Sequence, residues 1–175
     1  MTVSIALAQM LEARDRRAAR QREMLAHFAL PVVSLGVVMP GPVKDGPPSR
    51  IAFAVAMEAL GPLLAGRGWL IRHVERVVAA TGPEALVSVE AEASALKTAL
   101  IDLEDGHPLG RLWDFDVICP ERGQISRRVL GRAPRRCLIC GDEGHACSRA
   151  QRHSLADLMK VIEEMVDAYR HPPSA

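Results

Sequence analysis

The chain has 175 residues, of which 49% are hydrophobic and 25% are charged, and its formal net charge is +1. This size and composition are typical of one globular domain with a buried core. Aromatic residues make up only 3%, so a surface that stacks nucleic-acid bases is not expected, and the small net charge argues against electrostatic capture of a long polyanion. We expect residues 1–175 to form a single domain that does not bind nucleic acid.

The first residues show neither a charged leader segment nor a cleavable apolar stretch, and no apolar run approaches the length needed to cross a bilayer. We therefore expect a cytoplasmic protein without membrane contact. In that compartment cysteines stay reduced, so the four cysteines of the chain are better explained by metal binding or burial than by disulfides.

Hydrophobic periodicity and turn residues predict alternating helices and strands. In chain order, the predicted elements are a helix over 3–28, a strand over 31–39, a helix over 49–65, strands over 69–80 and 86–89, a helix over 91–104, strands over 111–119 and 124–130, and a helix over 155–170. A loop rich in Cys, His, Arg and Gly is expected over 131–153. The order favours an α+β fold, with a mixed β-sheet of about five strands flanked by helices.

Two acidic residues interrupt an apolar run in the segment Trp113-Asp114-Phe115-Asp116-Val117. Because strand side chains alternate between faces, Asp114 and Asp116 should point the same way and their apolar neighbours into the core. Like charges this close repel each other unless a cation lies between them. Mg²⁺ binds one or two carboxylates and leaves positions for phosphate oxygens. We interpret the pair as a Mg²⁺ site for phosphoryl or nucleotidyl transfer; the alternative is a solvated acidic pair.

A second group of chemically reactive residues lies in the 131–153 loop. Cys137 and Cys140 form a C-x-x-C pair, and Cys147 and His153 follow. Three thiolates and one imidazole make a complete tetrahedral set for Zn²⁺, which would be structural because no position stays open. His145 is an alternative fourth ligand. Unliganded thiols and a redox pair also remain open, although a redox C-x-x-C usually begins a helix within a βαβ unit.

Several motifs together resemble one protein family. They are Arg14-Asp15-Arg16-Arg17 followed by Arg20-Gln21; Pro31-Val32-Val33-Ser34; Pro40-Gly41-Pro42-Val43-Lys44-Asp45; Gly82-Pro83-Glu84; His107-Pro108-Leu109-Gly110-Arg111-Leu112-Trp113-Asp114-Phe115-Asp116-Val117; and Arg135-Arg136-Cys137-Leu138-Ile139-Cys140 with Cys147 and His153. They resemble the apo-citrate lyase phosphoribosyl-dephospho-CoA transferases, the holo-acyl-carrier-protein synthases of citrate lyase. The resemblance runs from about residue 10 to about residue 165.

The resemblance implies a reaction and its partners. The donor would be triphosphoribosyl-dephospho-CoA, and the acceptor a serine hydroxyl of the acyl carrier protein of apo-citrate lyase. The products would be a phosphodiester-linked prosthetic group and diphosphate. The resemblance also implies a nucleotidyltransferase-like fold, because an acidic pair on a strand that follows a helix is similar to the active-site strand of those enzymes.

For this reaction we assign Asp114 and Asp116 to Mg²⁺. The leaving diphosphate needs cations, and the candidates are Arg14, Arg17, Lys44 and Arg111, with Lys97 as a weaker one. A third carboxylate would take the proton of the serine, and we expect Glu104 to be this general base. Lys97 and Glu104 are seven residues apart and therefore share one face of the predicted 91–104 helix, away from its leucines.

Two other functions remain open at this point. The chain could be a non-catalytic zinc-knuckle adaptor that binds a protein partner, or a related transferase that acts on another carrier, such as that of malonate decarboxylase. A basic cluster, Arg127, Arg128, Arg135 and Arg136, could dock an acidic carrier protein or be solvated surface charge.

Overall fold

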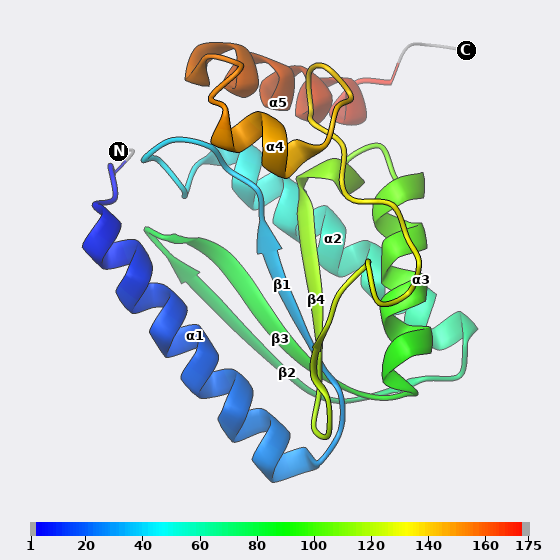
Figure 1. Cartoon of the computed structure of the whole chain (residues 1–175). Coiled ribbons are helices and arrows are strands. Elements are labelled where there is room, and N and C mark those ends of the chain that lie inside the picture. Colours follow the sequence, from blue (N-terminus) through cyan, green and yellow to red (C-terminus); the bar gives the residue numbers. More distant parts are fainter. Residues whose placement is uncertain (1–2, 173–175) are drawn as a thin grey trace.

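The computed structural model describes residues 3–172 as a five-stranded β-sheet with helices packed on both faces (Figure 1). The helices are α1 (Leu7–Phe28), α2 (Pro47–Gly66), α3 (Ala93–Gly106), the short 3-10 helix η1 (Gly110–Leu112), α4 (Gly144–Arg149) and α5 (Leu155–Arg170). The strands are β1 (Val32–Val37), β2 (Leu70–Ala79), β3 (Gly82–Glu90), β4 (Trp113–Cys119) and β5 (Gly123–Ile125). The α+β class is confirmed, and residues 1–2 and 173–175 of the predicted domain lie outside the described part of the chain.

The strand order is β2-β3-β1-β4-β5, and every neighbouring pair is antiparallel. The expectation of a mixed sheet was therefore wrong. Helices α2 and α3 each join two strands that run in the same direction, β1 to β2 and β3 to β4. In both cases another strand lies between the two that the helix connects. The two strands that each helix connects are therefore not neighbours in the sheet, and the described strands form no parallel pair.

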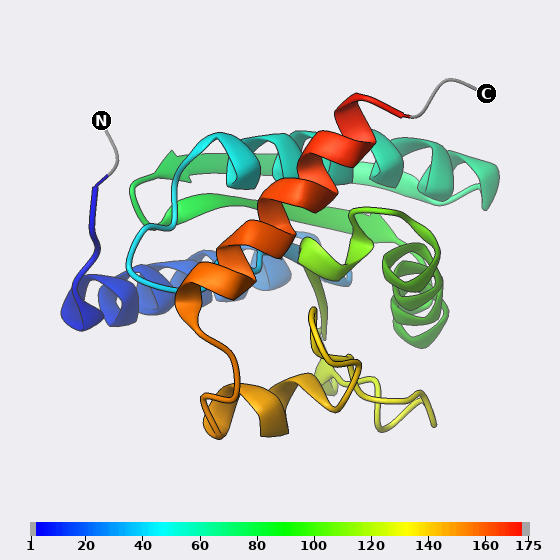
Figure 2. The same ribbon diagram turned by 90° about the horizontal axis from the view of Figure 1, so that it is seen from above.

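One face of the sheet carries the main hydrophobic core. Directly paired residues share a face, and Leu35 of β1 pairs with both Ala85 of β3 and Phe115 of β4. Figure 2 shows α2 and α5 over this face. The core is completed by buried apolar side chains from the sheet, from α2 and α5, and from α3, among them Val33, Val87, Trp113, Val117, Ala56, Leu60, Leu100 and Ile162.

The opposite face is only partly covered. Helix α1 lies against it (Figure 2), and a small apolar cluster of Met24, Val32 and Leu86 holds α1 to β1 and β3. The segment that contains α4 lies on this same side of the sheet (Figure 2). On this face, Asp114 and Asp116 of β4 line a cavity.

A tight turn between α3 and β4 fixes where β4 begins. A Cβ atom on Gly110 would lie 2.0 Å from the carbonyl oxygen of Glu104, so the backbones approach too closely for any side chain at this position. The indole N–H of Trp113 donates to the carbonyl of Ala52 at 2.8 Å, which ties the first residue of β4 to α2. The side chains that follow Trp113 are thus held in place from both sides.

Two segments differ from the sequence-based expectation. The strand predicted over 124–130 stops at Ile125, and turns follow, with hydrogen bonds from Leu130 N to Arg127 O and from Gly131 N to Arg128 O. The 131–153 loop is present, but it contains the helix α4. In the first segment Arg127 binds Glu104, and in the second Arg135 binds Glu104 and three cysteines gather with His153. Hydrophobic periodicity does not predict such side-chain contacts.

The expectation that no apolar run reaches bilayer-spanning length was wrong for α2, whose 20 residues are long and apolar enough by length and composition alone. In the fold, Ala52, Ala56, Leu60 and Leu64 of α2 are buried in the main core. The core helix of a globular protein passes the same test, and this packing explains why α2 is apolar.

Candidate active site

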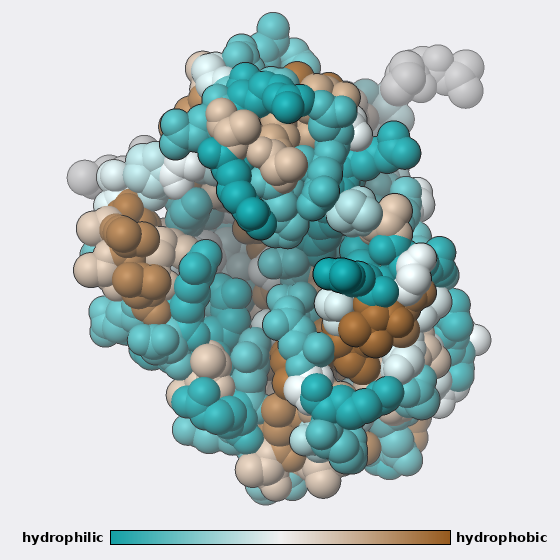
Figure 3. Space-filling model, in the orientation of Figure 1, coloured by the Kyte–Doolittle hydropathy of each residue, from teal (hydrophilic) through white to brown (hydrophobic). Residues whose placement is uncertain are grey.

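A cavity of 1170 Å³ opens over the uncovered face of β4. Figure 3 shows it as a hollow in the middle of the molecule, bordered mainly by hydrophilic surface. Its lining includes the two β4 carboxylates and several cationic side chains, and at the other end residues of the Cys/His segment. The sequence-predicted residues along its wall are Lys97, Arg111, Asp114, Asp116, Cys137, Cys147 and His153.

Asp114 and Asp116 lie on the same face of β4. Residues 113–119 alternate strictly between buried and half-buried, and the two aspartates are half-buried while Trp113 and Phe115 are in the core. In the β1–β4 ladder Asp114 pairs with Gly36 and Asp116 with Ser34. Their side chains are 47% and 36% exposed, so both carboxylates are open to the cavity. The predicted orientation of the pair is confirmed.

The two carboxylates affect each other electrostatically. Burial and the neighbouring charge of Asp114 raise the pKa of Asp116 above its ordinary value, and Lys97, with Nζ at 4.0 Å from Asp116 Oδ1, partly opposes this shift. Repulsion between adjacent carboxylates is the cost that a bound cation relieves. Two carboxylates on one face of a water-accessible cavity are hard oxygen donors of the kind that Mg²⁺ prefers.

The backbone of Phe115, between the two aspartates, is held by α3. Its N–H donates to Glu104 Oε1 at 2.8 Å, and its carbonyl accepts a hydrogen bond from the Lys97 ammonium. The predicted shared face of Lys97 and Glu104 is thus confirmed, and at this edge of β4, where no described strand pairs with Phe115, the two side chains supply its hydrogen-bond partners. Burial lowers the pKa of Lys97, while the charges of Glu104 and Asp116 act in the opposite direction.

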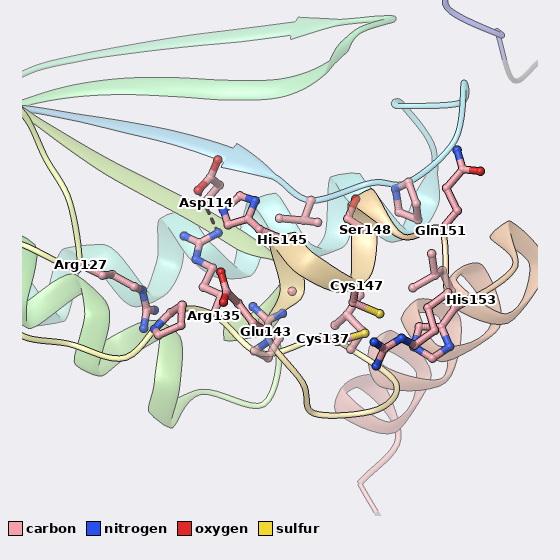
Figure 4. A pocket seen from close by; sticks show the side chains of 18 of the residues that line it. Asp114, Arg127, Arg135, Cys137, Glu143, His145, Cys147, Ser148, Gln151 and His153 are labelled. Atoms are coloured by element: carbon pink, nitrogen blue, oxygen red, sulfur yellow. Dashed lines mark ion pairs between the residues drawn. The ribbon is translucent and has the colours of Figure 1, made fainter.

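Glu104 also binds two arginines. Its side chain is 2% exposed; Oε2 accepts from Arg127 at 2.6 Å and Oε1 accepts from Arg135 at 2.7 Å. Arg135 then reaches Asp114, with Nη1 at 2.9 Å from Oδ1, as Figure 4 shows. Because both oxygens of Glu104 already accept hydrogen bonds, the geometry argues against the expected role as general base. It favours a positioning role instead.

Arg17 approaches the acidic pair from α1. Its guanidinium pairs with Glu84 of β3 and would lie 3.8 Å from a Cβ on Gly36, the ladder partner of Asp114. Arg17 therefore lies beside the backbone of β1 at the position opposite Asp114. Burial lowers the pKa of Arg17, and the charges of Asp114 and Asp116 oppose that shift, which places Arg17 within electrostatic reach of both.

The remaining predicted cations divide into two groups. Arg111 lines the cavity and donates to the carbonyl of Arg136. Lys44 and Arg14 are not part of the cavity lining. The Lys44 ammonium donates to the carbonyl of Met39, and burial, together with the charge of Arg14, lowers its pKa. Lys97 and Arg111 thus share the cavity lining with the aspartates and Arg17 interacts with them electrostatically, whereas Lys44 and Arg14 do not line the cavity.

The four predicted zinc ligands come together, and three of them, Cys137, Cys147 and His153, line the cavity (Figure 4). One donor atom from each of Cys137, Cys140, Cys147 and His153 lies within 4.8 Å of the others. His153 Nε2 is buried without a hydrogen-bond partner, as expected for an imidazole nitrogen that binds a metal. His145, the alternative ligand, lies outside this group. The cluster is a possible metal-binding site, and its ligand set is compatible with zinc.

The pKa values of Cys137 and Cys147 are shifted in opposite directions. Burial acts to raise the pKa of Cys137, but hydrogen bonds from the backbone N–H groups of Cys140 and Ile139 outweigh it and lower the pKa to about 6. Burial, followed by hydrogen bonds with Cys137 and Cys140, raises the pKa of Cys147 to about 12. A cation among the thiols would stabilise all of them as thiolates.

Sequence reasoning missed the role of two arginines. The sequence left two interpretations open for this basic cluster, carrier docking or solvated surface charge. Arg128 and Arg136 are exposed, but the side chains of Arg127 and Arg135 are only 13% and 19% exposed and both bind Glu104. Solvated surface charge therefore does not describe these two half-buried arginines. The basic character of this segment does not reveal that Arg127 and Arg135 bind Glu104, a buried carboxylate 23 and 31 residues earlier in the chain.

Comparison with known proteins gives a consistent result. A family model described as apo-citrate lyase phosphoribosyl-dephospho-CoA transferase matches residues 5–169. A protein of that name from Shigella flexneri serotype 5b (strain 8401) is 42% identical over 164 residues, which cover 94% of this chain and 90% of the relative. A second, from Escherichia coli O7:K1 (strain IAI39 / ExPEC), shows the same identity and coverage.

Removing the buried carboxylate should destabilise the fold strongly. Glu104→Ala leaves Arg127 and Arg135 without their shared partner and Phe115 N–H without an acceptor. We expect a loss of about 3–5 kcal/mol in the free energy of unfolding, measured by urea denaturation. Asp105→Ala is the matched control, because Asp105 also pairs with Arg127 but is 55% exposed; it should cost about 1 kcal/mol or less. Equal losses in the two variants would contradict the assignment of Glu104.

Proposed function

This chain belongs to the apo-citrate lyase phosphoribosyl-dephospho-CoA transferase family, and we propose that it transfers the 2'-(5''-phosphoribosyl)-3'-dephospho-CoA group to a serine of the citrate lyase acyl carrier protein. The donor in this proposal is the triphosphate form of the group, and diphosphate is released. The observation that carries the proposal is the pair Asp114 and Asp116 on one face of β4, open to a cavity that Lys97, Arg111 and Arg135 also line. We place the reaction in the cytoplasm.

Asp114 and Asp116 are the residues that would hold Mg²⁺. The ion would offset negative charge on the reacting phosphate and on the diphosphate that leaves. The chain contributes the rest of the charge compensation. Lys97 and Arg111 present cationic groups to the same cavity, and Arg17 acts on the aspartates from the α1 side. Such preorganised charges stabilise a transition state in which negative charge spreads over the phosphoryl oxygens.

The chemistry is that of a nucleotidyltransferase. The hydroxyl oxygen of the carrier serine forms a bond to the phosphorus next to the ribose and releases its proton to water, and the bond from this phosphorus to the diphosphate breaks. The acidic pair on β4, a strand that follows helix α3, is the feature that supports a nucleotidyltransferase-like fold. Lys44 and Arg14 lie outside the cavity lining, so we assign them no direct contact with the diphosphate.

We further propose that Cys137, Cys140, Cys147 and His153 bind one structural Zn²⁺. The unpartnered His153 Nε2 and the shared position of the four donor atoms support this. The adaptor alternative is not favoured, because the cluster lies in the wall of the cavity that contains the acidic pair rather than on a separate module. Action on a different carrier, such as that of malonate decarboxylase, is tested with the assay below.

The transfer reaction can be followed as a mass gain of the carrier protein. Asp114→Asn and Asp116→Asn should each lower the rate at least about 100-fold, since each removes one negative ligand of the metal while keeping the side-chain shape. Asp102→Asn is the control; this residue is exposed on α3 and pairs with Arg132. Mass spectrometry of apo-carrier incubated with donor and Mg²⁺ gives the rates. A mass gain that persists unchanged in both aspartate variants would refute the proposed site, and modification only of the malonate decarboxylase carrier would change the assigned partner.

The metal content of the Cys/His cluster can be measured directly. Protein purified without chelator should contain about one Zn²⁺ per chain by elemental analysis, because three thiolates and one imidazole fill a tetrahedral site. Cys137→Ser should reduce the zinc content and lower the melting temperature, whereas Cys119→Ser, at a buried cysteine outside the cluster, should leave the zinc content unchanged. Zinc-free protein whose stability is insensitive to Cys137→Ser would rule out the structural metal.

A further inference from the structure

We propose that Arg135 is an exchangeable counter-ion. In the absence of metal, one end of its guanidinium neutralises Asp114. When Asp114 binds Mg²⁺, the same end of the guanidinium binds a phosphate oxygen of the donor instead. The inference rests on the proposed function and assigns to that site a phosphate-binding residue that was expected on the protein surface. The two ends of the Arg135 guanidinium bind carboxylates that differ in burial, and this difference supports the role.

The guanidinium of Arg135 joins two carboxylates in different surroundings. Its Nη2 is 2.7 Å from Glu104 Oε1, and Glu104 is 2% exposed, so this contact is shielded from water and ions. Its Nη1 is 2.9 Å from Asp114 Oδ1, and Asp114 is 47% exposed in the cavity. Exposed ion pairs contribute little and are screened, whereas breaking a buried pair is costly. The contact with Asp114 is therefore the one that breaks first.

The backbone of Arg135 is fixed, so the exchange involves only the side chain. The carbonyl of Arg135 accepts a hydrogen bond from Gly144 N at 2.8 Å, and Cys137 N donates to Asp142 O at 2.6 Å. A Cβ on Gly144 would lie 3.2 Å from the same carbonyl, which shows how closely the two segments pack. Because the Cys/His cluster begins at Cys137, two residues later, it holds Arg135 at the edge of the acidic pair.

A cation and Arg135 compete for the same carboxylate. When Asp114 binds Mg²⁺, its interaction with Nη1 weakens, while Nη2 remains anchored on Glu104. Arg135 lines the cavity, so the released end stays among the groups that face the donor. A guanidinium suits this role because its planar fork can bind one acceptor at each end, which the single ammonium of a lysine does not do in the same geometry.

Removing Arg135 should therefore have opposite effects on metal binding and on transfer. In Arg135→Gln, Asp114 loses its competing cation, while Glu104 keeps Arg127 and the Phe115 N–H. With Mn²⁺ as the probe and electron paramagnetic resonance as the readout, donor-free Arg135→Gln should bind the ion about three- to tenfold more tightly than wild type. The KM for the donor should rise and kcat should fall. Arg72→Gln, which removes an arginine of β2 that pairs with Glu90 of β3, is the control and should change none of the three quantities.

The outcomes separate this inference from the proposed function. Wild-type protein that shows no saturable Mn²⁺ binding sensitive to Asp114→Asn would overturn the metal site itself. Saturable binding that Arg135→Gln does not tighten would overturn only the exchange. If Arg135→Gln fails to fold, Arg135→Lys decides: it keeps the charge near Asp114, so Mn²⁺ affinity should stay close to that of wild type while the donor KM rises. Wild-type transfer kinetics in Arg135→Lys would refute the role of the two-ended guanidinium.

Discussion

The site depends on two hydrogen bonds that α3 makes to one residue of β4. Lys97 and Glu104 bind the carbonyl and the N–H of Phe115, on the side where no described strand pairs with it. An unpaired polar backbone edge beside the core would be unfavourable, and without these bonds β4 could twist or change its register. A one-residue slip would turn Asp114 and Asp116 into the core. The orientation of the acidic pair is therefore fixed by a helix as well as by the sheet.

Glu104 connects this constraint to the rest of the cavity. A buried carboxylate needs compensating charge, and Arg127 and Arg135 supply it from the segment that follows β5. The same pairing draws this segment over the open face of β4 and brings the Cys/His cluster, which begins at Cys137, to the cavity wall. One residue in α3 thus supports the β4 backbone, the Arg135–Asp114 contact and the position of the possible metal centre.

The sequence predicted those features that depend on short, regular spacing. The alternation of residues 113–117 placed Asp114 and Asp116 on one face, the seven-residue spacing placed Lys97 and Glu104 on one helix face, and the Cys/His spacing identified all four members of the cluster. The antiparallel sheet was missed because β1 inserts between the strands that α3 connects. The positions of Arg127 and Arg135 were missed because an arginine-rich segment has the same pattern whether its charges face water or a buried glutamate distant in the chain.

The exchange rate of the Phe115 amide hydrogen tests this account most directly. If Glu104 accepts a hydrogen bond from this amide, nuclear magnetic resonance should show protection from exchange as strong as that of amides in the β1–β4 ladder. A free amide on an open strand edge exchanges far faster. Exchange of the Phe115 amide at the rate of an exposed edge residue would show that α3 does not hold β4, and the structural basis proposed for the acidic pair would be incorrect.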